Sequence, residues 1–403
     1  MTLAQTNKSN ILSKLYLASF LSSCFLFWWL PSLYYIIVLR LPNPVSSFSM
    51  YISIVSAFFY LVGYFILPTI APIRLMSDDI INGCEQLSKK MTMILFLPSL
   101  IYAVYFCASH FYEKYGEYSI PFAGQGLFYA HLFFGFMFLS TIRPEKHSKK
   151  AVVLVFICII LPRIIVSLHY GRVFIAFGVL PMLFIAIARG WLNLTIRKVV
   201  CIILLGVSIL IVPSIFRGDF KNYSSDAGSE YARNFIGVWL LAGSSLNVFD
   251  RFYNSSILGF CPPILVSFTE QMIPYKILGI CTVPQADGTR VANADAIATY
   301  MINGDSYSRG GGTGSTYILD LYWFNGIMAI IIGSIILGST CKLFIGSVGY
   351  RSVFSGIWAE CLVRSLFIVR GTYGYMYQRI PSLVFATILC ALIVRAALRV
   401  RGR

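Results

Sequence analysis

Apolar residues run along this chain in long blocks, which short polar segments separate. A helix needs about 20 mostly apolar residues to cross the hydrocarbon core of a bilayer. The blocks reach or nearly reach that length, so they predict membrane-spanning helices. The predicted spans are residues 15–39, 49–71, 91–112, 122–142, 151–168, 172–188, 199–215, 314–338, 352–370 and 380–397.

The first span is expected to remain in the mature protein. It begins after Lys8 and Lys14 and runs for about 25 residues, which is too long for the apolar core of a signal peptide. No small-residue cleavage site follows it. We therefore interpret it as a retained helix.

One segment, residues 216–313, is much longer than a typical connection between helices. Its apolar parts, 235–246 and 256–268, predict either interfacial helices or a pair of short extra spans. An even number of extra crossings leaves the topology unchanged. The pattern therefore predicts an all-α polytopic membrane helix bundle of 10 to 12 transmembrane helices. Residues 1–403 form one integral membrane domain, and 216–313 is its large outer loop.

Composition supports the membrane class. The chain is 58% hydrophobic and 12% charged, whereas soluble domains carry roughly 25% charged residues. These values exclude a soluble globular enzyme, a disordered protein and a small disulfide-rich secreted protein. The net charge of +16 would suggest nucleic acid in a soluble protein, but a chain this apolar lacks the necessary hydrated face. No nucleic-acid partner is expected.

The basic residues predict the orientation, because short loops rich in Lys and Arg stay on the cytoplasmic side. If the N-terminus lies inside, every alternate short loop is basic, and both termini are cytoplasmic. Roughly half of the 32 basic residues then lie inside. These are Lys8, Lys14, Arg74, Lys89, Lys90, Arg143, Lys146, Lys149, Lys150, Arg189, Arg197, Lys198, Lys342, Arg351, Arg395, Arg399, Arg401 and Arg403.

The outer basic residues are mostly arginine, although the positive-inside rule opposes cations there. Arginine presents a planar fork of donors that matches phosphate or carboxylate at two points. The set therefore predicts an anionic ligand at the outer face. The alternative is contact with lipid headgroups together with salt bridges to acidic residues of the outer loop. The outer arginines are Arg40, Arg163, Arg172, Arg217, Arg233, Arg251, Arg290, Arg309, Arg364, Arg370 and Arg379.

Two features place ionisable groups within the spans or at their ends. Arg163 and Arg172 flank the outer turn of a predicted helical hairpin, with His169 between them. Glu360 and Arg364 are spaced to pair on one helix face. Charges at this depth usually face a polar cavity or each other. A self-contained structural pair is the alternative for Glu360 and Arg364.

The motifs of several other site types are missing from the sequence. It contains no HExxH, CxxC, P-loop or GxSxG motif and no aspartate-rich outer loop, so no metal or cofactor is expected. Asp78 and Asp79 fall in a predicted inner loop. Cys261 and Cys281 both fall in the outer loop, and either a disulfide or two thiols fits them.

A glycine run over residues 308–315, headed by Arg309, precedes the eighth predicted span. Such a run lets backbone N–H groups approach a ligand, although a simple turn also explains it. Tyr317, Asp320 and Trp323 follow where the helix enters the membrane. Aromatic residues at that level also anchor helices at the interface.

With these residues described, the chain resembles the Wzy-type O-antigen and polysaccharide repeat-unit polymerases, which are related in general plan to O-antigen ligases. The resemblance rests on the stretch GTGSTYILDLYWFNGIMAIIIGSIILG over 312–338, on the HYGR hairpin ending at Arg172, and on the layout with its large outer loop. The spacing from Arg217 to Gly228 also fits an R-x10-G pattern described for some such polymerases.

The resemblance implies a glycosyltransferase of the bacterial inner membrane, with the large loop in the periplasm. It would polymerise undecaprenyl-pyrophosphate-linked oligosaccharide without a metal, surrounded by membrane lipids and with a chain-length regulator as a further partner. Arginine donors would bind the pyrophosphate. The candidate substrate-binding residues are Arg163, Arg172, Arg217, Arg233, Arg251, Arg290, Arg309, Arg364 and Tyr317.

The proton acceptor for the attacking hydroxyl remains open among His169, Glu230, Asp219 and Asp320; for the first, packing at a helix end is the alternative. Three other functions are also open: an O-antigen ligase, a lipid-linked oligosaccharide flippase and a structural scaffold. A flippase needs cations through the depth of its cavity, whereas these cluster at the outer mouth. A scaffold leaves the arginines unexplained.

Overall fold

The protein is an all-α polytopic membrane bundle. The computed structural model describes residues 3–38, 40, 45–68, 76–109, 122–143, 149–167, 173–192, 246, 248–250, 283–284, 290–291, 316–371, 373–377 and 379–401. Helices account for nearly all of these residues. Among them the extended structure is one antiparallel ladder between two short strands, β1 (Val283–Pro284) and β2 (Arg290–Val291).

Most predicted spans coincide with observed helices. Residues 199–215 lie outside the described part, as does nearly all of 216–313. The helices are α1 (Leu3–Cys24), continued by a π-helical turn (Phe25–Trp29), α2 (Leu30–Leu33) and a second π-helical turn (Tyr34–Val38), then α3 (Ser47–Ile66), α4 (Asp78–Ser109), α5 (Phe122–Thr141), α6 (Lys149–Ser167), α7 (Val173–Ala188), α15 (Tyr317–Val348), α16 (Ser355–Phe367) with two 3₁₀ turns (Ile368–Arg370 and Tyr373–Met376), and α17 (Ile380–Arg401).

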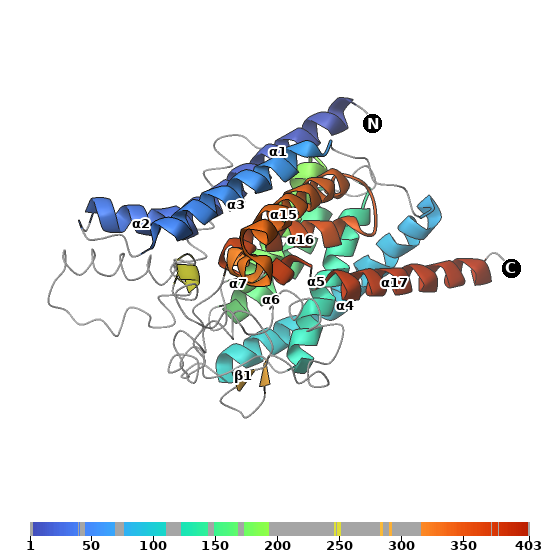
Figure 1. Cartoon of the computed structure of the whole chain (residues 1–403). Helices are drawn as coiled ribbons and strands as arrows, with labels where there is room; N and C mark the ends of the chain where they lie inside the picture. The colour runs from blue at the N-terminus through green and yellow to red at the C-terminus, as the bar shows by residue number, and fades with distance from the viewer. Residues whose placement is uncertain are drawn as a thin grey trace.

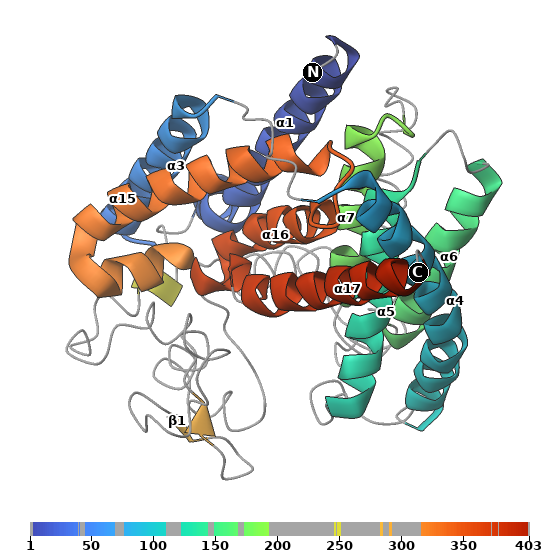
Figure 2. The same ribbon diagram turned by 90° about the vertical axis from the view of Figure 1, so that its right-hand side faces the viewer.

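The helix α16 is at the centre of the bundle. It packs against α15, α7, α5, α1 and α17, while α3 pairs with α15 and α4 pairs with α5 and α6. Figure 1 shows α1, α3 and α15 running side by side, and Figure 2 shows α4, α5 and α6 on the opposite flank of α16. Because α16 is buried on nearly every side, its charged residues must find partners inside the protein.

The outer faces of the helices are apolar. Side chains such as Ile37, Tyr105 and Phe385 are about two-thirds exposed. In water such continuous apolar faces would drive aggregation, whereas in a bilayer they contact lipid. Among the residues that the structure describes, five helical segments are long and apolar enough to cross a membrane: Asn10–Leu33, Ser47–Ile66, Asp78–Ser109, Tyr317–Val348 and Ile380–Val400.

The observed α4 corrects one predicted boundary. The predicted span began at residue 91, with Asp78 and Asp79 in a loop, but both aspartates form the first turn of a continuous helix. Acidic side chains favour the positive end of the helix dipole there, so the helix extends beyond its apolar block. Hydropathy marks the part of a helix that enters the membrane and not where the helix starts.

The observed α15 corrects a second prediction. Span 314–338 was predicted as one helix, but the chain breaks at Asn325 (φ −159°) and Gly326 (φ +57°) and then continues to Val348. Glycine adopts positive φ without steric cost, which explains its place at the break. A short first segment therefore meets the long second segment at an angle, visible at the bend of α15 in Figure 2.

Two glycines let α3 and α15 approach closely. A Cβ atom on Gly338 would overlap the Tyr60 carbonyl oxygen, and one on Gly63 would overlap the Ile335 carbonyl oxygen. Lipid-embedded helices associate through close packing and interhelical hydrogen bonds, and small residues permit both. Ser56 at this interface bonds to the Tyr317 hydroxyl at 2.7 Å and to Ser334 at 2.9 Å.

Substituting Gly338→Ala is expected to lower the stability of the purified protein by about 1–3 kcal/mol, because backbone atoms of α3 must move away from the new methyl group. The control is Gly126→Ala, since a Cβ there meets nothing within 4 Å. The measurement is the thermal unfolding midpoint in detergent. Equal midpoints for the two variants would contradict the close approach of α3 and α15.

The first helix is part of the core. Leu12, Tyr16, Phe20, Cys24 and Trp28 recur every fourth residue and are all fully buried. The Tyr16 hydroxyl bonds to Ser365 of α16 at 2.6 Å and to Tyr60 of α3 at 2.9 Å. This stripe joins α1 to the bundle by packing and by hydrogen bonds.

Two arginines hold together the helix ends that were predicted to be cytoplasmic. Arg351, between α15 and α16, pairs with Glu85 of α4 at 3.0 Å and donates to the Thr141 carbonyl at the end of α5. Arg189, after α7, donates to the Ser140 and Tyr350 carbonyls. Burial, and then the nearby Arg351, lower the pKa of Arg189 to about 10. These contacts bring the first turns of α4, the ends of α5, α7 and α15, and the start of α16 to a common side of the bundle.

Candidate functional site

Arg163 enters the bundle from α6, one turn before that helix ends. Its side chain is 2% exposed, and its Nη2 donates to the Phe128 carbonyl of α5 at 2.9 Å. Gly178 of α7 makes room for it, because a Cβ atom there would lie 2.8 Å from the Arg163 Cδ. The guanidinium is therefore built into the interior among α5, α6 and α7.

Glu360 and Arg364 form the predicted pair on α16. Arg364 donates to the Glu360 Oε1 from Nε at 3.0 Å and from Nη2 at 2.8 Å, and the two side chains are 6% and 4% exposed. Phe177 of α7 covers the Arg364 guanidinium, with its ring centroid 4.8 Å from Cζ. The i, i+4 pairing that the spacing predicts is confirmed.

Arg379 joins this region from the residue before α17. Its Cζ lies 3.5 Å from the ring centroid of Tyr129 on α5, a cation–π contact. Within the part of the chain that the structure describes, no carboxylate pairs with it. The Tyr129 ring therefore supports the Arg379 guanidinium.

These three arginines and one carboxylate form what we call the arginine cluster: Arg163, Glu360, Arg364 and Arg379. Arg163 interacts electrostatically with both Glu360 and Arg379. Arg163 and Arg364 lie about one turn before the ends of α6 and α16, Arg379 directly precedes α17, and Glu360 lies near the middle of α16. In the described structure its members carry three positive charges and one negative charge, and the low dielectric strengthens their attraction for an anion.

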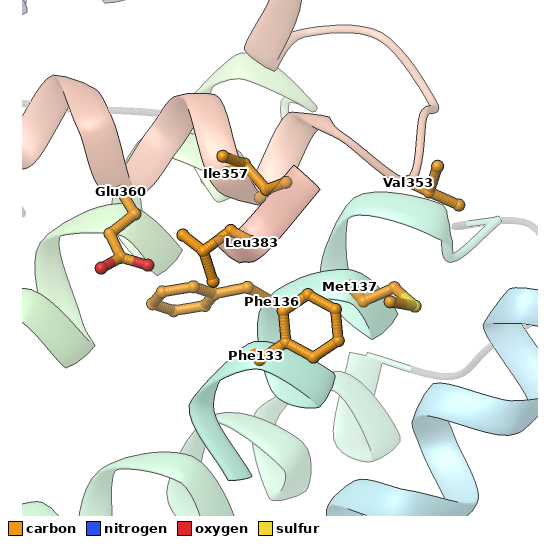
Figure 3. A pocket seen from close by; sticks show the side chains of 8 residues that line it. Phe133, Phe136, Met137, Val353, Ile357, Glu360 and Leu383 are labelled. Atoms are coloured by element: carbon orange, nitrogen blue, oxygen red, sulfur yellow. The ribbon is translucent and has the colours of Figure 1, made fainter. Parts of the chain in front are cut away.

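A small pocket of about 10 Å³, roughly the room that one water molecule needs, lies beside Glu360, among α5, α16 and α17. Figure 3 shows Glu360 at one edge of this pocket and Phe136, Ile357 and Leu383 along it. Glu360 is the one charged residue of its lining, and the remaining lining residues are Phe133, Met137, Val353 and Gly356. The pocket is therefore small and apolar apart from Glu360.

Tyr317 and Asp320 lie in the first segment of α15 and are fully buried. The Asp320 Oδ2 accepts a hydrogen bond from the Tyr373 backbone N–H at 2.6 Å, which ties α15 to the turn after α16. Tyr317 bonds to Ser56. The catalytic role of Asp320 and the binding role of Tyr317 stay predictions.

The other predicted site residues fall where the structure describes no side chain. Arg290 belongs to β2, of which only the backbone is described. The rest lie outside the described residues, as do Cys261 and Cys281; these are His169, Arg172, Arg217, Glu230, Arg233, Arg251 and Arg309.

Three residues of this region were not among the predicted site residues. The sequence analysis included Arg379 in the outer arginine set but did not assign it to the site. Tyr129 supports Arg379 through the cation–π contact. His131 is 2% exposed, and its Nε2 has no hydrogen-bond partner in the described structure. His131 interacts electrostatically with Arg163. Of these three residues, only Arg379 could be noticed in the sequence, as a member of the outer arginine set. Tyr129 and His131 lie inside an ordinary apolar block.

Among the described residues, no group of three or more His, Cys, Asp or Glu side chains forms a metal site. The donors present are guanidinium groups, which bind anions and not cations. No protein-family model, curated protein or solved structure matches the chain.

Proposed function

We propose that this membrane protein polymerises oligosaccharide repeat units carried on undecaprenyl pyrophosphate, at the periplasmic face of the bacterial inner membrane. The observation that supports the proposal best is the arginine cluster. Arg364 pairs with Glu360, and Arg163 interacts electrostatically with both Glu360 and Arg379. Pyrophosphate is the ligand whose charge and oxygen geometry suit several arginine forks together.

In the proposed reaction a hydroxyl of the acceptor repeat unit attacks the anomeric carbon of the growing chain. The bond from that carbon to the pyrophosphate oxygen breaks, and the pyrophosphate leaves with the bonding electrons on its undecaprenyl carrier. The hydroxyl proton passes to a base or to water. Arginines that stabilise the charge developing on the leaving oxygen lower the barrier without a metal.

The cluster suits the leaving-group side of this reaction. Arg163 and Arg364 are fixed by the Phe128 carbonyl and by Glu360, so their donors need little reorganisation. Arg379 rests on the Tyr129 ring. Lipid anchoring of both substrates in one leaflet supplies proximity. The base remains a prediction among Asp320, His169, Asp219 and Glu230, and the outer-loop arginines remain predicted to hold the rest of the donor and acceptor.

A gene deletion with lipopolysaccharide gel analysis in the native host tests this function. A polymerase mutant keeps core carrying one repeat unit and loses the ladder of longer chains, and a plasmid copy restores it. Loss of the single unit as well would contradict the proposal and favour a ligase or a flippase. An unchanged ladder would contradict all three.

A further inference from the structure

A short piece of the predicted outer loop is bound to the first turn of α3. The Asp250 Oδ1 accepts hydrogen bonds from the Ser46 hydroxyl and, at 2.7 Å, from the Ser49 hydroxyl, while Oδ2 accepts from the Ser46 backbone N–H at 3.3 Å. Ser46 is the N-cap residue of α3, and the first turn of this helix has no acidic residue of its own. A carboxylate is favoured there by the free N–H groups and by the helix dipole. The loop therefore supplies the negative charge from 204 residues along the chain.

The neighbouring Phe249 attaches the same piece of loop to α15. Its ring is fully buried, and its centroid lies 5.4 Å from that of Tyr322 in the first segment of α15 and 6.5 Å from that of Phe48 in α3. The Tyr322 and Phe48 centroids are 5.9 Å apart. Leu246 and Val248 are buried beside them, and Figure 2 shows this piece of the loop in yellow near the bend of α15. Aromatic rings attract one another at such separations, so the loop, α3 and α15 are joined here.

The first segment of α15 has a second attachment, to the turn between α16 and α17. Asp320 accepts a hydrogen bond from the Tyr373 backbone N–H, and Tyr373 begins the 3₁₀ turn that follows α16. Towards its other end the segment stops at the break at Asn325 and Gly326. A segment that ends at such a break can turn without moving the rest of its helix. Its position therefore depends on its contacts with the loop and with the turn.

We infer that Phe249 and Asp250 form a strap, through which the outer loop holds the first segment of α15 and, through that segment, the turn that separates Arg364 from Arg379. Movement of the loop at the strap is then transmitted to the backbone that carries two members of the arginine cluster. Phe249 and Asp250 are positioning residues in this arrangement. The inference concerns conformation alone and does not depend on the proposed function.

The alternative is a simple helix cap, in which Asp250 stabilises only the first turn of α3. The two differ in reach. A cap affects the helix that it ends, and its influence fades within about one turn. A strap couples α3 to the turn after α16, although no hydrogen bond joins these two elements directly in the described structure. Contacts that lie in series do not prove such coupling, which has to be measured.

The test is hydrogen–deuterium exchange of the full chain in phosphatidylcholine nanodiscs, followed by mass spectrometry of its peptides. Asp250→Ala should speed exchange about tenfold in the first turn of α3 and also in the peptide that contains Tyr373, because charge-assisted hydrogen bonds that hold the strap are lost. Phe249→Ala should speed exchange in both places, although Asp250 is still present. The matched control is Asp79→Ala, which removes an exposed carboxylate from the first turn of α4 and should change neither peptide.

Faster exchange confined to α3 in Asp250→Ala would overturn the inference, since Asp250 would then be a simple cap. Unchanged exchange of the Tyr373 peptide in Phe249→Ala would also overturn it. The double variant Phe249→Ala with Asp250→Ala should exchange no faster than the faster single variant, because either change releases the same strap. Effects that add up would mean two independent contacts and would contradict the inference.

Wild-type protein provides a test that does not require the variants to fold. In increasing low concentrations of urea, the first turn of α3, residues 317–324 and residues 373–377 should gain exchange together, as one cooperative unit. Opening of 317–324 at a clearly different urea concentration from the other two segments would overturn the inference. This result leaves the proposed function untouched, which is tested by the length of the glycan chains.

Discussion

Substituting Glu360→Ala is expected to destabilise the folded protein by about 3–5 kcal/mol, enough to abolish most of its accumulation in the membrane. The carboxylate is 6% exposed and takes two N–H bonds from Arg364 on a helix surrounded by other helices. Its removal leaves the guanidinium buried without its carboxylate. The measurement is the yield of monodisperse protein after detergent extraction.

Two further variants show whether the cause is the buried charge. Asp79→Ala removes an exposed carboxylate from the first turn of α4 and should leave the yield unchanged. Adding Arg364→Leu to Glu360→Ala removes the charge and should restore most of the yield, because burial of two apolar groups avoids the desolvation cost. Wild-type yield from Glu360→Ala alone would mean that the pair contributes little to folding.

Substituting Arg379→Lys is expected to lower the rate of chain extension by on the order of a hundredfold in a folded protein. Lysine keeps the charge but lacks both the planar fork and the flat face that rests on Tyr129. Gel analysis of a complemented deletion strain should show core with one repeat unit and few longer chains.

Arg395→Lys is the matched control, since this exposed residue of α17 lies at the other end of the helix. It should support a normal ladder. The same loss of long chains is expected from Arg172→Lys and Arg290→Lys if fork geometry also matters in the outer loop. Normal ladders from all three outer substitutions would indicate that these arginines act only as surface charge.

Local patterns explain which parts of the fold the sequence could predict. The apolar blocks placed α3, α5, α6 and α7 closely, because helix formation and membrane burial depend on neighbouring residues. The Glu360–Arg364 pair followed from i, i+4 spacing. The early start of α4 was not predicted because its first turns are polar. Hydropathy indicates burial in lipid and does not indicate where a helix forms.

Long-range packing explains what the sequence could not predict. Arg163 and Arg379 are brought together by the arrangement of α5, α6, α16 and α17, which no local spacing encodes. The close approach of Gly63 and Gly338 to the facing helices is equally non-local. The small pocket beside Glu360 is formed by three helices, each of which has the sequence of an ordinary apolar span.

The most direct measurement is chain extension by the purified protein in proteoliposomes that contain undecaprenyl-pyrophosphate-linked repeat units. The account predicts products with two or more repeat units, one undecaprenyl pyrophosphate released for each new glycosidic bond, and a strong loss of both with Arg379→Lys. Substrate that stays at one repeat unit while the protein remains folded, or extension that is unchanged in Arg379→Lys, would contradict it.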